Sequence, residues 1–153
     1  RKHPSQFLRI FQHGTGFKHI FIKGLIIMVA IITGDSIDIS APEGTFTYEP
    51  LRDAKTVIGI AGGSGITPFH SLASAIADGL EDCNLVLLYG SRTKDSILLK
   101  EEFDALEAKS SRIKVVHVLS HETADGYEHG FITGELIRKY APAGNYSIFL
   151  CGP

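Results

Sequence analysis

The chain has 153 residues, of which 44% are hydrophobic, so it can bury a core and is not intrinsically disordered as a whole. Its 15 Lys and Arg against 17 Asp and Glu give a formal net charge of −2, which disfavours nucleic acid and anionic membranes as partners. Cys83 and Cys151 lie far apart, without Cys-x-x-Cys or zinc-type spacing. We therefore expect no disulfide framework and no metal site, and a cytoplasmic location.

The first fifty residues carry weak patterns. The apolar run at 25–32 (LIIMVAII) is too short for a membrane span and predicts a buried strand or short core segment, with an exposed partner surface as the alternative. Residues 36–40 alternate with period two and 41–44 form a turn, which is typical of antiparallel β structure. The polar stretch 48–55 is a linker candidate, so we place two domains at 1–50 and 51–153.

After residue 50, strands alternate with helices. Apolar strands are predicted at 56–61, 85–89, 113–119 and 147–151, and helices at 68–78, 97–109 and 133–140. This alternation predicts an α/β fold with a doubly wound parallel sheet of at least four strands.

Other expectations concern the borders and faces of these elements. The first helix opens at Pro68 and is capped by Gly79, and the second helix has Leu98, Phe103 and Leu106 as candidates for its inward face. The polar stretch 120–130 is expected to be a loop. Because the chain stops directly after its last strand, we expect the second domain to be truncated at its C-terminus.

The segment Ile60-Ala-Gly-Gly-Ser-Gly-Ile-Thr-Pro68 joins the first of these strands to a helix. Its glycines let the backbone come into contact with a phosphate. Unpaired backbone amides and the helix dipole can then stabilise the negative charge of that phosphate. It predicts a pyrophosphate-binding loop, or alternatively a tight turn without ligand. Pro68 stands where Gly-x-Gly-x-x-Gly has its third glycine, which disfavours an ordinary Rossmann loop, and a P-loop lysine is absent. Ile66 stands where a nucleophile elbow around Ser64 needs glycine, which disfavours a hydrolase.

Small, hydroxyl or basic residues follow the later strands. The carboxyl ends of parallel strands meet at one edge of a sheet, where open α/β sheets bind ligands. We therefore expect a binding site that includes Gly90, Ser91, Arg92, Ser120, His121, Cys151, Gly152 and Pro153. For Arg92 a solvated or helix-capping role is the alternative.

Three segments occur in a particular order: IAGGSGITPF at 60–69, LLYGSRT at 87–93 and FLCGP at 149–153. This set resembles the NAD(P)-binding domain of the ferredoxin–NADP reductase family of flavoprotein oxidoreductases. Residues 34–35 and 41–46 are similar to the last strands of that family's flavin-binding barrel. The resemblance implies strand order 3-2-1-4 for the sheet, and a partial, atypical antiparallel β-barrel at 1–50.

The resemblance also implies an activity. A member of this family passes hydride from NAD(P)H to FAD, and then electrons to an acceptor such as an iron–sulfur protein or a haem. Carried over by position, Gly62, Gly63, Ser64 and Gly65 hold the pyrophosphate, within a cofactor-binding segment that also includes Ile66, Thr67 and Pro68. Thr67 approaches the nicotinamide ribose, and Cys151 and Gly152 line the nicotinamide pocket. Hydride transfer needs orientation rather than an acid or base, so no catalytic residue is assigned.

The chain departs from the family at two places. Members that prefer NADPH place Ser-Arg after the third strand and a tyrosine shortly after it, whereas this chain has Ser120-His121 and Phe131. A histidine holds a 2′-phosphate less well than an arginine, which favours NADH, while Arg92 favours NADPH. The family's Arg-x-Tyr-Ser/Thr flavin motif is absent, and its Gly-x-x-Ser turn has only a degenerate echo at 13–17. Flavin binding is therefore assigned to the longer protein and left open for this chain.

Two other functions stay open at this point. One is a non-catalytic module that binds a nucleotide or a partner and has lost flavin chemistry, which the missing flavin motif favours. The other is an ordinary dehydrogenase, for which no Tyr/Lys or His/Asp set can be placed near the glycine segment.

Overall fold

The structure, a computed structural model, describes residues 9–12, 18–22, 25–29 and 44–153. The chain divides into two compact units, Arg1–Phe46 and Thr47–Pro153. Within the described ranges, no helix combines the length and the apolar character needed to cross a membrane.

The first unit contains a small antiparallel sheet. Its strands β1 (Arg9–Gln12), β2 (Lys18–Ile22) and β3 (Leu25–Val29) pair in the order β1-β2-β3, with Ile20 opposite both Ile10 and Ile27. The strand expected within 25–32 is present as β3, while its burial stays a prediction. The expected strand at 36–40, the segment 34–35 and the echo at 13–17 lie outside the described residues, as does all but the last residue of the turn at 41–44. The β-barrel also stays a prediction.

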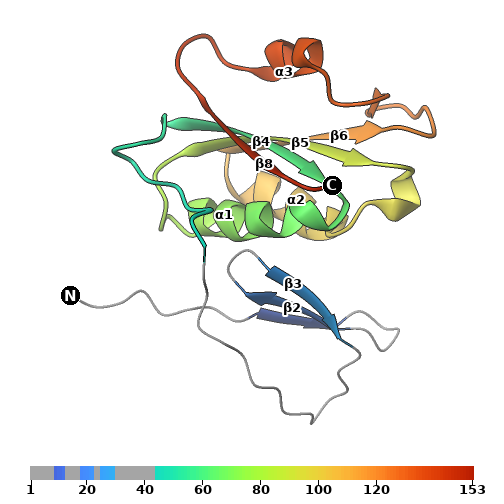
Figure 1. Ribbon diagram of the computed structural model, residues 1–153, viewed down its shortest axis with the longest axis horizontal. Helices are drawn as coiled ribbons and strands as arrows, with labels where there is room; N and C mark the ends of the chain where they lie inside the picture. The colour runs from blue at the N-terminus through green and yellow to red at the C-terminus, as the bar shows by residue number, and fades with distance from the viewer. Residues whose placement is uncertain (1–8, 13–17, 23–24, 30–43) are drawn as a thin grey trace. The chain divides into compact units, whose positions relative to one another are not determined.

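The second unit is built on a five-stranded sheet in which all strands are parallel (Figure 1). Its strands are β4 (Thr56–Gly62), β5 (Asn84–Ser91), β6 (Ile113–Leu119), β7 (Glu128–His129) and β8 (Ser147–Cys151). They lie in the order β7-β6-β5-β4-β8, which confirms the predicted order 3-2-1-4 for the four predicted strands. The carboxyl ends of β4, β5, β6 and β8 therefore meet at one edge.

Three helices accompany this sheet. They are α1 (Thr67–Ala77), α2 (Lys100–Lys109) and α3 (Gly134–Tyr140), and single 3-10 turns η1 (Gly63–Ile66) and η2 (Lys94–Ser96) follow β4 and β5. In Figure 1, α1 and α2 lie on one side of the sheet and α3 lies on the other. As predicted, Pro68 is in the first turn of α1, and this helix ends before Gly79.

The core lies between the central strands and the helices α1 and α2. The neighbouring interior strands β4 and β5 supply near-continuous apolar runs, as expected for parallel strands covered on both faces. Each large apolar side chain removed from water contributes about 1.5–3 kcal/mol. The fully buried ones include Val57, Ile58, Phe69, Ile76, Leu85, Leu87, Leu88, Tyr89, Phe103 and Leu119.

The second helix differs from the expectation at its start. It begins at Lys100 instead of residue 97, because Leu99 has left-handed backbone angles (φ 58°, ψ 29°) and interrupts the helix. Leu98 is 39% exposed, so its inward assignment is wrong, whereas Phe103 is fully buried and Leu106 half-buried. A hydrophobic pattern does not reveal a single residue whose backbone leaves the helical region.

The predicted loop at 120–130 contains a short strand that the sequence did not indicate. Glu128 and His129 form β7 and pair in parallel with Val118 and Leu119. This strand is polar, and Glu128 is held by an ion pair with Lys139 at 2.6 Å. Its pairing therefore depends on tertiary contacts that no apolar alternation announces.

Candidate functional site

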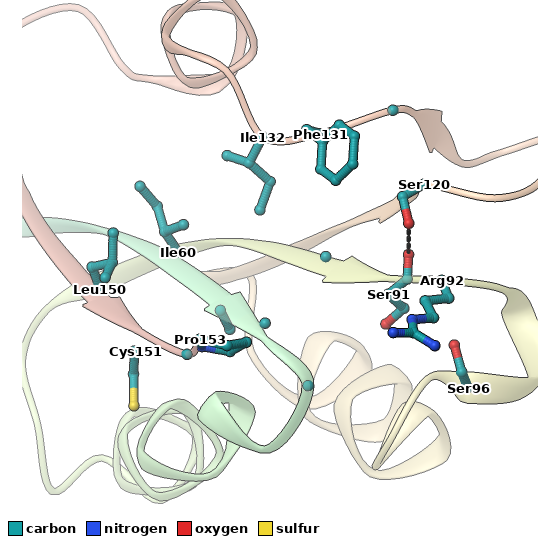
Figure 2. Close-up of a pocket in the computed structure, with 16 residues that line it drawn as sticks. Ile60, Ser91, Arg92, Ser96, Ser120, Phe131, Ile132, Leu150, Cys151 and Pro153 are labelled. Carbon is teal, nitrogen blue, oxygen red and sulfur yellow. Dashed lines mark hydrogen bonds between the residues drawn. The ribbon is translucent and has the colours of Figure 1, made fainter.

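A pocket of about 550 Å³ lies at the edge where the four strand ends meet (Figure 2). Its volume is within the range of ordinary small-molecule sites. Its lining comes from the ends of β4, β5 and β8, the residues that follow the strands, and the segment before α3. It consists of Ile60, Ala61, Gly62, Gly63, Gly90, Ser91, Arg92, Ser96, Ser120, Gly130, Phe131, Ile132, Leu150, Cys151, Gly152 and Pro153. The structure thus brings together nine residues predicted for a binding site: Gly62, Gly63, Gly90, Ser91, Arg92, Ser120, Cys151, Gly152 and Pro153.

The glycine loop, residues 62–65, connects β4 to α1, and its first two residues line the pocket. Gly63 has a φ of +50°, a left-handed conformation that favours glycine, and Gly63 and Ser64 are exposed. At the start of α1 the Thr67 amide donates to the Ser64 carbonyl and Pro68 has no N–H, so the exposed backbone here belongs to Gly63 and Ser64. Such a loop can present backbone N–H groups to an anion.

Gly65 has a different role in the structure. It is buried and does not line the pocket, and a β-carbon there would lie 2.1 Å from the carbonyl oxygen of Cys151. Gly152, with φ +150°, is also close to the glycine loop, since a β-carbon added there would lie 2.9 Å from the Gly62 nitrogen. The glycine loop and the end of β8 therefore pack backbone against backbone.

The residues just after the glycine loop point into the protein. Ile66 and Pro68 are buried, and Thr67 is 5% exposed with its hydroxyl donating to the Ser64 carbonyl at 3.3 Å. None of Ser64, Gly65, Ile66, Thr67 and Pro68 lines the pocket. The sequence placed them in the binding segment, and their contact with a ligand stays a prediction.

One end of the pocket is polar. Arg92 is the only charged side chain among the described lining residues, and it lies at this end with Ser96 and Ser120 (Figure 2). The Ser120 hydroxyl donates to the Ser91 carbonyl at 3.4 Å. His121 does not line the pocket: it is exposed, with its ring Nδ1 2.7 Å from Ser120 Oγ. This end of the pocket therefore offers a ligand one guanidinium group and serine hydroxyls. The described lining contains no acidic residue.

The other end is apolar. Figure 2 shows Ile60 and Leu150 on the same side of the sheet as Ile132 and Phe131, with the Cys151 side chain pointing the opposite way. Phe131 is 77% exposed and Leu150 is 68% exposed, although both are large hydrophobic residues. Exposed apolar side chains grouped around a pocket are typical of a ligand or partner surface.

Seven lining residues were not among the site residues predicted from the sequence: Ile60, Ala61, Ser96, Gly130, Phe131, Ile132 and Leu150. For Phe131 a signal existed, because the resemblance puts it at the position of a tyrosine in members that prefer NADPH. For Ile60 and Leu150 none existed, since an apolar residue in a parallel strand reads as core on either face.

The two cysteines differ in burial, and they form neither a disulfide nor part of a metal-binding cluster in the described residues. Burial raises the pKa of the Cys83 thiol to about 11, and Cys83 is fully buried. Cys151 is half-buried and lines the pocket, and neither cysteine is in a disulfide. In the part of the chain that the structure describes, no three His, Cys, Asp or Glu side chains are grouped to hold a metal ion.

Comparison with known proteins gives relatives for both sequence and fold. The chain is 35% identical over 158 residues to NADH-cytochrome b5 reductase 1 from Lodderomyces elongisporus, covering 99% of this chain and 49% of that protein. It is 31% identical to the cytochrome b5 reductase domain of nitrate reductase from Ulva prolifera, with a TM-score of 0.57, covering 65% of this chain and 40% of that one.

A ferredoxin NADP+ reductase from Neisseria gonorrhoeae, solved with bound FAD and NADP, shares the fold. Its TM-score is 0.55 at 19% identity, and the match covers 71% of this chain and 46% of that one. The chain spans about half the length of the cytochrome b5 reductase relative.

Residues 60–153 match the family described as the oxidoreductase NAD-binding domain, and this stretch includes the glycine loop and every residue that lines the pocket. The chain belongs to that family of oxidoreductase NAD-binding domains.

Proposed function

We propose that this chain is the NADH-binding part of a flavin-dependent reductase that passes electrons to a haem protein of the cytochrome b5 type. The observation that carries the proposal is the pocket itself. It joins a glycine loop with exposed backbone, an arginine that faces no acidic residue in the described lining, and an apolar wall at the carboxyl edge of a parallel sheet. Open α/β sheets bind nucleotides at this place.

The polar half of the pocket suits the phosphates and the adenosine. Gly62 and Gly63 bring backbone close to the ligand, in a loop that runs directly into α1 and so lies near the positive end of its dipole. Arg92 supplies the cationic side chain, and no acidic residue in the described lining opposes an anion. The hydroxyls of Ser91, Ser96 and Ser120 offer hydrogen bonds to ribose.

The apolar half suits the nicotinamide. Ile60, Leu150 and Ile132 offer a surface from which a flat ring displaces water, and Cys151 and Gly152 close the pocket at the end of β8. The work of these residues is to orient one face of the ring, since hydride transfer needs a fixed geometry more than an acid or base. FAD, when bound, accepts the hydride.

FAD enters this proposal from the family resemblance. Most of the segment similar to the flavin barrel lies outside the described residues. A barrel at 1–50 and a doubly wound sheet at 51–153 belong to the same proposal, as do a partner acceptor protein and a cytoplasmic location.

Two observations support NADH over NADPH and a haem acceptor over an iron–sulfur protein. His121 lies outside the pocket lining, so no basic side chain follows β6 within the pocket. The relative from Lodderomyces elongisporus is named an NADH-cytochrome b5 reductase. We therefore propose NADH as the nucleotide and a cytochrome b5-type haem protein as the acceptor for this chain.

Calorimetric titration of the purified chain with NADH and with NADPH tests the proposal. We expect saturable binding of both, tighter for NADH. A folded chain that binds neither nucleotide would overturn the proposal and leave the non-catalytic partner-binding module. A visible absorption spectrum of the same sample, with a flavin band as the positive result, tests whether this chain holds FAD.

A further inference from the structure

Tyr89 is a fully buried tyrosine whose hydroxyl joins two segments of the site. It lies on β5, and its ring is in the core. Its hydroxyl donates to the Gly63 carbonyl at 3.3 Å and accepts from the Leu98 amide at 3.2 Å. A phenol has one proton to donate and lone pairs to accept with, so both bonds form at once.

The first of these partners belongs to the glycine loop. A peptide unit is planar and trans, so fixing the direction of the Gly63 carbonyl also fixes the Ser64 N–H, which points away from the Tyr89 hydroxyl. Gly63 has a positive φ and, as a glycine, can adopt other backbone angles readily. At the start of η1, the Tyr89 hydroxyl therefore adds a bond from another strand that favours one orientation of this peptide.

The second partner belongs to the segment that follows β5. Arg92 and Ser96 of this segment line the pocket, and Leu98 comes just before Leu99, which has left-handed backbone angles. The start of the segment is held independently, by reciprocal bonds between Thr93 and Ser96 and by Glu122 accepting from the Lys94 amide. Tyr89 holds its end.

The hydroxyl is suited to this role because it stays protonated. Burial raises the pKa of Tyr89 above its ordinary value of 10.0, so the donor to Gly63 persists throughout the neutral pH range. The ring is fixed by core packing, so the hydroxyl does not need to be ordered when a ligand binds.

We infer that Tyr89 is a positioning residue for the dinucleotide. Its hydroxyl orients the Gly63–Ser64 peptide toward the pyrophosphate and couples this peptide to the segment 92–98 that follows β5. This rests on the proposed function, because it assigns a role within the same site. Tyr89 itself does not line the pocket and acts through the backbone groups that it holds.

The test compares Tyr89→Phe with the unmodified chain. Phenylalanine keeps the ring and removes only the hydroxyl. We expect the variant to bind NADH and ADP about threefold to tenfold more weakly, the effect of one hydrogen bond, and to bind adenosine unchanged. The matched control is Tyr140→Phe, which removes a hydroxyl bonded to Glu128 outside the pocket and should leave all three affinities unchanged.

The adenosine arm separates positioning from general loosening of the fold. Equal weakening toward ADP and adenosine would show that Tyr89 acts only structurally, and would overturn the inference. Unchanged NADH affinity in Tyr89→Phe would overturn it while leaving the proposed function intact. Failure of the unmodified chain to bind NADH would overturn both.

A second measurement uses the unmodified chain and does not depend on the folding of the variant. Leu98 does not line the pocket, yet its amide is bonded to the hydroxyl that holds Gly63. Binding of ADP should therefore slow hydrogen exchange at the Leu98 amide. An unchanged exchange rate at Leu98 with ADP bound would overturn the inference.

Discussion

The backbone of Cys151 lies where a side chain on Gly65 would be. A β-carbon at Gly65 would be 2.1 Å from the Cys151 carbonyl oxygen and 2.4 Å from its carbonyl carbon. The two segments follow adjacent strands, with Ala61 of β4 opposite Cys151 of β8. Because the obstacle is backbone at the end of a paired strand, it cannot turn aside as a flexible side chain would. The glycine at 65 therefore sets how closely the two sides of the pocket approach.

Replacement of Gly65 by alanine is expected to force this contact apart. We predict that Gly65→Ala lowers the free energy of unfolding by about 1–3 kcal/mol or more, the range of overpacking substitutions. It should also weaken NADH binding, because Gly62 and Cys151 on the two sides of the contact both line the pocket. Denaturant unfolding and calorimetric titration measure the two effects.

The matched control is Gly134→Ala at the start of α3. A β-carbon there meets only the flexible end of Arg138 at 3.8 Å, so stability should stay within about 0.5 kcal/mol of the unmodified chain or rise slightly. Equal stability of Gly65→Ala and the unmodified chain would show that the two segments can separate without cost.

Arg92 is expected to carry the main charge interaction with the ligand, since it is the only charged side chain among the described lining residues. We predict that Arg92→Gln weakens dinucleotide binding about tenfold or more, the size of a lost hydrogen bond to a charged group. The loss should shrink at high salt, because part of the attraction is screened. Calorimetric titration at two salt concentrations measures both effects.

The control for this change is Arg138→Gln, an exposed arginine on α3 that does not line the pocket. It changes the net charge by the same amount and should leave affinity unchanged at both salt concentrations. If Arg92→Gln binds as tightly as Arg138→Gln does, Arg92 is a solvated residue without a role in binding.

The sequence predicted the parts of the site that depend on chain order. The glycine loop and the residues after β5, β6 and β8 could be placed at one edge because parallel strands share their polarity. It could not predict which side chains face inward at that edge. Thr67 and His121 have the polarity of ligand contacts, yet Thr67 bonds to the Ser64 carbonyl and His121 lies beside Ser120 outside the lining.

Two further differences arise from tertiary contacts. Gly65 suggested room for a phosphate, whereas in the structure the neighbour that needs the room is Cys151. Leu98 fitted the apolar face of a helix, but its amide bonds to Tyr89 and the helix begins only after Leu99. Both partners are remote in sequence or come from another element, so neither contact leaves a local pattern.

The two cysteines should differ in reactivity. Cys83 is fully buried and its pKa is raised to about 11, so at pH 8 only about one molecule in a thousand carries the thiolate there. Cys151 is half-buried at the pocket. We predict that the native chain alkylates at Cys151 first, and that both cysteines react after unfolding.

Mass spectrometry of peptides after timed alkylation locates the modified cysteine. Cys151→Ser serves as the control, since it should remove the early modification in the native chain while leaving Cys83 to react after unfolding. Modification of Cys83 at the rate of Cys151 would contradict the burial of the Cys83 thiol.

His117 on β6 should make stability depend on pH near neutrality. Burial, with the nearby positive charge of Lys100, lowers the pKa of its imidazole below the ordinary value of 6.5. The unfolded chain therefore takes up a proton at His117 at a higher pH than the folded chain does, so stability falls as the pH drops through about 6.5. We predict that the free energy of unfolding decreases less between pH 7.5 and pH 5 in His117→Gln than in the unmodified chain. Between pH 7.5 and pH 9 His117 is neutral in both states, so the two curves should run parallel there. Identical slopes below pH 7 would show that His117 titrates alike in the folded and unfolded chain.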